Sequence, residues 1–165
     1  MLDNHAKLMQ FFSVAENVTG RKKLQKMIYI LQKCNIPFEE KYNFHFYGPY
    51  SEELTLRVEE LCNLGFLHEI KEDKSNYYQY NYTITDDGKE FLQQFALDMP
   101  NYEEKVEKLK EKSSRFLELV ATMFYFDYLP IEEMIGKVHK VKPKQNYSEE
   151  EIKEAIQFMK EITLN

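Results

Sequence analysis

Residues 61–91 constrain the fold more than any other part of this 165-residue chain. They contain, in order, a helix end at Leu64-Gly65, an apolar run over 66–70, a charged turn over 71–76, a tyrosine-rich run over 77–84 and a helix start at Thr85. Glycine suits the left-handed position that follows a helix, and alternation over eight residues is typical of a strand. The segment therefore predicts an antiparallel hairpin held between two helices.

Apolar residues at helical spacing predict helices on both sides of this hairpin. The expected ranges are 4–17, 21–33, 51–64 and 85–97, then 101–127 with a bend near Ser113, 130–138 and 148–162. The helix over 21–33 has the clearest apolar face, formed by Leu24, Met27, Ile28 and Leu31. We expect its basic side chains to lie off that face: Arg21, Lys22, Lys26 and Lys33. A short strand is expected over 41–47, where aromatic residues alternate.

The hairpin also carries a fold resemblance. Its leucine-glycine-hydrophobic entry and its tyrosine-x-hydrophobic-threonine-x-x-glycine exit, which ends at Gly88, resemble the wing of a winged-helix domain. The resemblance implies an α+β fold that is mainly α. Met99-Pro100 marks a boundary, so we expect a winged-helix-like domain over 1–98 and a helical extension over 99–165 packed on it.

Charge argues against binding a DNA duplex in the usual winged-helix manner. The formal net charge is −6, and neither half of the chain is basic, which disfavours broad neutralisation of phosphates. The helix before the wing normally enters the major groove. Here that helix carries one arginine, Arg57, against the four carboxylates of Glu52, Glu53, Glu59 and Glu60. Nucleic acid is therefore not expected to bind through this helix.

Other residue patterns give no sign of a disulfide, a catalytic motif, a metal site or a membrane segment. Cys34 and Cys62 form no CxxC pair and are expected to be reduced thiols. The four histidines are scattered, phosphate-loop and GxSxG motifs are absent, and Asp86-Asp87 is explained by a helix N-terminus. We therefore expect no enzyme activity, no cofactor and no metal. The sequence has no secretory signal and no apolar run long enough to span a membrane, so a cytoplasmic location without membrane binding is expected.

Two segments carry a family resemblance. Residues 23–32 begin Lys-Leu-Gln-Lys and include Tyr29, and residues 44–51 contain Tyr47-Gly48-Pro49. Together they resemble the YwgA-like family of uncharacterised proteins from Bacillus and its relatives, over most of the chain. More distantly, residues 5–95 are similar to the Panacea antitoxin domain, although Phe46 replaces its usual basic residue and the helical tail is longer. The Panacea resemblance implies direct contact with a partner through Lys23, Leu24, Gln25, Lys26, Tyr29, Tyr47, Gly48 and Pro49.

Taken together, these features favour a non-enzymatic protein-interaction module, antitoxin-like or regulatory, with another protein as its partner. Its expected contact residues are Arg21, Lys22, Lys23, Gln25, Lys26, Tyr29, Tyr47, Gly48, Pro49 and Tyr50. Simpler interpretations stay open: the basic residues can form a solvated helix face, and Tyr47-Gly48-Pro49 can be only a turn. The lysines over 137–144 are expected in a solvated loop. The alternative function is a DNA-binding regulator that uses Arg21, Lys22, Lys23 and Lys26, and homodimerisation stays open.

Overall fold

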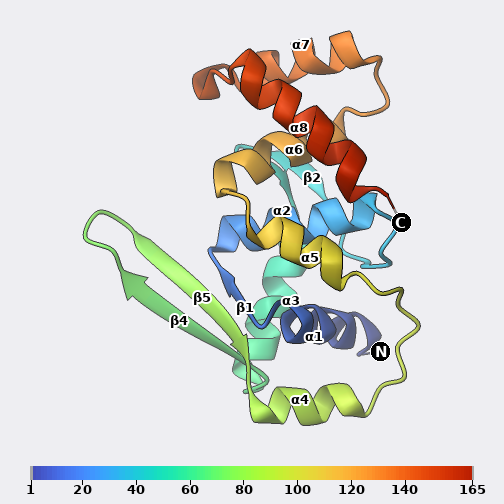
Figure 1. Cartoon of the computed structure of the whole chain (residues 1–165). Helices are drawn as coiled ribbons and strands as arrows, with labels where there is room; N and C mark the ends of the chain where they lie inside the picture. The colour runs from blue at the N-terminus through green and yellow to red at the C-terminus, as the bar shows by residue number, and fades with distance from the viewer. Residues whose placement is uncertain (1, 165) are drawn as a thin grey trace.

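The computed structural model describes residues 2–164. These residues contain eight α-helices and five strands, joined by loops (Figure 1). In chain order they are α1 (Asp3–Ala15), β1 (Asn17–Thr19), α2 (Arg21–Lys33), β2 (Asn43–His45), β3 (Gly48–Tyr50), α3 (Glu52–Asn63), β4 (Leu67–Asp73), β5 (Tyr78–Ile84), α4 (Asp86–Gln93), α5 (Glu103–Lys110), α6 (Ser114–Tyr125), α7 (Ile131–Val141) and α8 (Glu149–Ile162), with a 3₁₀ turn at Pro143–Gln145. The fold is α+β and mainly helical, as the sequence predicts.

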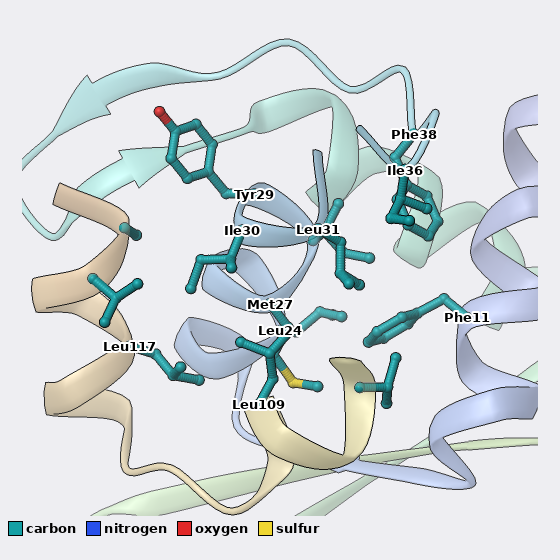
Figure 2. Packing of buried hydrophobic residues seen from close by; sticks show 14 of the residues in the cluster. Phe11, Leu24, Met27, Tyr29, Ile30, Leu31, Ile36, Phe38, Leu109 and Leu117 are labelled. Carbon is teal, nitrogen blue, oxygen red and sulfur yellow. The ribbon is translucent and has the colours of Figure 1, made fainter. Parts of the chain in front are cut away.

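Helix α2 lies at the centre of the core and is enclosed on all sides. Eight consecutive residues, from Leu24 to Leu31, are buried. Figure 2 shows α2 side chains between Phe11 of α1 on one side and Leu117 of α6 on the other. Lys26 lies off the apolar face, where its Nζ donates to Pro49, yet it is fully buried, because neighbouring elements cover the polar face of the helix as well as its apolar face.

The hairpin between α3 and α4 is confirmed. Strands β4 and β5 pair antiparallel with Leu67 opposite Ile84 and Asp73 opposite Tyr78, and they extend away from the helices as an arm (Figure 1). Strand β1, which the sequence pattern did not predict, pairs with the other edge of β5 and places Val18 opposite Tyr82. The order of the three-stranded sheet is therefore β1-β5-β4.

Capping side chains set where the helices begin. Ser51 and Thr85 accept hydrogen bonds from the backbone N–H groups three residues later, at 3.1 and 3.0 Å, and Ser148 forms a capping box. The single long helix expected over 101–127 is two helices. Helix α5 ends at Lys110, and Ser113 caps the start of α6. Asn101 does not cap α5; its side chain instead accepts from the N–H of Glu103.

The helices that follow Pro100 pack against the first part of the chain. Helix α5 contacts α1 and α2, and α6 contacts α2 and β3 on one side and α7 and α8 on the other. Fully buried residues of α5 and α6, among them Val106, Leu109, Leu117 and Val120, belong to the same core as α1 and α2. Strand β3, which precedes α3, is therefore held between α2 and α6.

Gly88 provides a test of how closely α4 is fitted to the base of the hairpin. A Cβ atom at this position would lie 2.2 Å from the backbone oxygen of Phe66 and 2.7 Å from Cε of Met9. We expect Gly88→Ala to lower the free energy of unfolding by about 2 kcal/mol, since such overpacking forces backbone shifts. Urea denaturation followed by circular dichroism measures this change.

The matched control is Gly136→Ala in α7, where an added Cβ would meet no atom within 4 Å. This change should leave stability the same or raise it by up to about 1 kcal/mol, because alanine favours a helix interior. Equal stability of the two variants would show that the α4 contact with Phe66 can relax.

Candidate functional site

A cleft of about 710 Å³ opens between α2, α3, the β2–β3 turn and the β4–β5 hairpin. Six of the ten residues predicted to contact a partner line it: Arg21, Lys22, Gln25, Lys26, Tyr47 and Tyr50. The hairpin contributes three tyrosines that the prediction did not include: Tyr77, Tyr78 and Tyr82. The sequence does carry a signal for them, since they belong to the tyrosine-rich second strand, but that signal was used only for the fold.

The other four predicted residues lie outside the cleft. Lys23 points toward α5 and donates to the backbone oxygen of Lys110 at 2.6 Å. Tyr29 is buried and its ring packs 4.9 Å from that of Tyr42. Gly48 and Pro49 are buried in the turn behind the cleft. These four residues shape the surroundings of the cleft and do not form its surface.

The two segments that carry the family resemblance are physically clamped together. The Gln25 side chain donates to the backbone oxygen of Ser51 and accepts from the Ser51 N–H, both at 2.9 Å. The next residue, Lys26, donates through Nζ to the backbone oxygen of Pro49 at 2.6 Å. Gln25 and Lys26 therefore hold the segment that follows Tyr47 against α2.

Gly48 allows this turn to approach the core. Its φ of +88° favours glycine, and an added Cβ would lie 3.2 Å from Oγ1 of Thr122 and 3.6 Å from Nζ of Lys26. This close approach allows the Lys26 amine to reach the backbone oxygen of Pro49.

A buried carboxylate, Glu118 of α6, lies behind the cleft and is 1% exposed. Lys22 Nζ lies 2.8 Å from its Oε1 without the alignment of a hydrogen bond. Lys142 Nζ lies 3.9 Å from its Oε2, which also accepts from the Tyr147 hydroxyl at 3.4 Å. Sequence reasoning missed Glu118; an acidic residue inside the apolar run over 116–124 is the signal that could have found it.

The expectation that Lys142 belongs to a solvated loop was wrong. Its side chain is 6% exposed, and its Nζ donates to the backbone oxygen of Phe46 as well as approaching Glu118. The Phe46 oxygen belongs to the β2–β3 turn. Lys142 therefore connects the segment after α7 to the turn that carries Tyr47.

Three lysines, Lys22, Lys26 and Lys142, surround the one carboxylate of Glu118, and we call these four residues the lysine cluster. Burial lowers the pKa of Lys26 to about 8; the negative charge of Glu118 opposes this, and the positive charges of Lys22 and Lys142 add to it. Burial also lowers the pKa of Lys142. At neutral pH the cluster has more positive than negative charge.

Arg21 and Lys22, which line the cleft, contact tyrosine side chains in and beside it. The Arg21 guanidinium lies 3.6 Å from the centre of the Tyr80 ring, and its Nε donates to the Tyr82 hydroxyl at 3.3 Å. Lys22 Nζ lies 5.0 Å from the centre of the Tyr47 ring. Cation–π contacts of this kind contribute about 0.5–1 kcal/mol at exposed sites, so they favour these arrangements of the side chains.

The outer surface of α3 is acidic. Arg57, its only basic residue, turns toward Glu53 and toward the buried carboxylate of Glu40. Glu59 and Glu60 stay exposed. The positive charge of Arg57 is therefore not available to a phosphate backbone from this helix.

Within residues 2–164, no group of three or more His, Cys, Asp and Glu side chains is arranged to hold a metal ion. Burial raises the pKa of the Cys62 thiol to about 11. None of the helices described is both long enough and apolar enough to cross a membrane.

Comparison with known proteins identifies a relative that matches almost the whole chain. The chain is 57% identical over 162 residues to "Uncharacterized protein YwgA" of Bacillus subtilis (strain 168), covering 98% of each sequence. No protein-family model matches the chain.

Lys26→Met tests whether this lysine is buried with a lowered pKa. Between about pH 8 and 10.5 the folded protein loses the Lys26 proton while the unfolded chain keeps it, so the unfolded state binds more protons and stability rises with pH. We expect the free energy of unfolding of the wild type to rise by about 2 kcal/mol relative to Lys26→Met between pH 7 and pH 10. Urea unfolding at a series of pH values measures this difference.

Lys153→Met serves as the control, since Lys153 is exposed on α8. Its stability should follow that of the wild type across the same pH range. Parallel curves for Lys26→Met and the wild type would contradict the burial of a charged amine at this position.

Proposed function

The chain belongs to the YwgA family of uncharacterised proteins, and we propose that it is a cytoplasmic, non-enzymatic protein-interaction module, antitoxin-like or regulatory, on a winged-helix-like scaffold. The scaffold proposal is supported by the order α3, β4, β5, α4 and by β1 as the third strand. The antitoxin-like proposal is supported by the resemblance of residues 23–32 and 44–51 to the Panacea domain.

The observation that carries the proposal is the exposure of aromatic side chains around a preformed cleft. Tyr47, Tyr77 and Tyr78 are 57%, 61% and 60% exposed, and all three line the cleft. Tyrosine and arginine are the residues that most often dominate protein–protein binding energy. Several large exposed rings beside one cleft are typical of a contact surface for a partner.

The polar groups of the cleft support binding more than catalysis. Gln25, Lys26 and Ser51 hydrogen-bond with one another or with the backbone of the turn. Arg21 lies 3.4 Å from Glu69, and Lys22 pairs with Glu118. These groups hold the walls of the cleft in place.

DNA binding through Arg21, Lys22, Lys23 and Lys26 has weaker support. Arg21 and Lys22 are paired with carboxylates. Lys23 donates to the backbone oxygen of Lys110, and Lys26 is fully buried. A phosphate backbone would have to compete with these internal partners.

The test is purification of the tagged protein from cells that naturally produce it. We expect a stoichiometric protein partner to co-purify, and Tyr47→Ala to reduce its recovery at least tenfold, because an aromatic hot spot is worth about 2 kcal/mol or more. Tyr128→Ala is the matched control, since Tyr128 is exposed but does not line the cleft. Both variants should unfold at the wild-type urea concentration.

Two results would overturn this proposal. The first is repeated purification without a stoichiometric protein. The second is a DNA mobility shift at low salt that weakens steeply with salt and is abolished by Lys22→Glu with Lys23→Glu, as expected for phosphate binding.

A further inference from the structure

The lysine cluster has unused capacity to bind an anion. An ammonium group can donate three hydrogen bonds, and within residues 2–164 the Lys26 Nζ donates only to Pro49. Lys26 is fully buried yet lines the cleft. A buried charge without full compensation is costly, so a second carboxylate that contacts Lys22 at the surface would be stabilised by the charge of Lys26 behind it.

Lys22 connects the buried cluster to the open cleft. Its side chain is 37% exposed while its Nζ lies 2.8 Å from Glu118. The exposed Tyr47 ring, 5.0 Å from the same Nζ, stands at this end of the cleft. A group that enters beside Tyr47 therefore meets the Lys22 amine first.

The other side of the cleft is acidic, which restricts the kind of anion that fits. Glu59 and Glu69 also line the cleft, and only Glu69 has a cationic partner within salt-bridge distance, Arg21 at 3.4 Å. A nucleic acid, with a charge on every nucleotide, would place phosphates near these carboxylates at a cost on the order of 1 kcal/mol each in water. A chain with one or two local negative charges avoids this repulsion.

We propose that the cleft binds a partner segment in which an Asp, Glu or C-terminal carboxylate contacts Lys22 in front of the buried charge of Lys26, with a neighbouring aromatic or aliphatic side chain against the cleft tyrosines. This inference rests on the proposed function and adds the chemistry of the partner. The carboxylate supplies the charge that Glu118 alone does not, and Tyr47 and Tyr50 provide the apolar surface beside it.

The experiment selects binders from a displayed library of random dodecapeptides with the full-length protein as bait. Selected peptides should be enriched in Asp or Glu next to Tyr, Phe or Leu. The strongest of them, labelled with fluorescein, is then titrated by anisotropy against the wild type, Lys22→Met and the control Lys153→Met. We expect Lys22→Met to weaken binding at least tenfold and Lys153→Met to leave it unchanged.

The pH dependence of the titration tests whether Lys26 takes part. Lys26 is faced by Glu118 from α6, by Lys22 from its own helix and by Lys142 from the end of α7. A carboxylate beside Lys22 is attracted by the positive charge of Lys26 behind it, so affinity should fall between pH 7 and pH 9, as Lys26 loses its proton near pH 8. Lys26→Met should bind weakly at both values without this fall.

Three outcomes would overturn the inference: a library that yields no acidic peptides, selected peptides that bind Lys22→Met as tightly as the wild type, or displacement of the labelled peptide by a DNA oligonucleotide at lower concentration than by its own unlabelled form. If co-purification still returns a protein that needs Tyr47, the proposed function survives and only the carboxylate is wrong. If acidic peptides bind but no protein co-purifies, the cleft binds carboxylates and the proposed function as a protein-interaction module is wrong.

Discussion

The hydrogen bonds that join Gln25 and Lys26 of α2 to Pro49 of β3 and to Ser51 form a clamp on which the rest of the site depends. Because α2 is enclosed on all sides, the polar ends of Gln25 and Lys26 must find partners inside the protein. They find them in the backbone of Pro49 and Ser51. This fixes the position of β3 and of Ser51, which begins α3, and so places one wall of the cleft against the other.

Local chemistry explains what the sequence could predict. The hairpin over 67–84 and the caps at Ser51, Thr85 and Ser148 are encoded by residues close together in the chain, and the structure contains them. Strand β1 escaped prediction because three residues carry too little pattern; it exists only through pairing with β5.

Tertiary burial explains what the sequence could not predict. Helical periodicity assigns Lys26 to a polar face, but it does not show that other elements cover that face. Glu118 meets Lys22 only because α6 packs on α2, and Lys142 joins them only because its side chain reaches Glu118 and Phe46. Six of the ten proposed contact residues nevertheless share one cleft, because the clamp joins the two segments that contain them.

The lysine cluster also dictates when the cleft can be completed. Its members come from residues 22, 26, 118 and 142, and Lys142 additionally holds the backbone of Phe46 in the turn beside Tyr47. During synthesis on the ribosome, the first hundred residues emerge long before Lys142 does. The end of the cleft that carries the excess positive charge is therefore assembled only after residue 142 has been made.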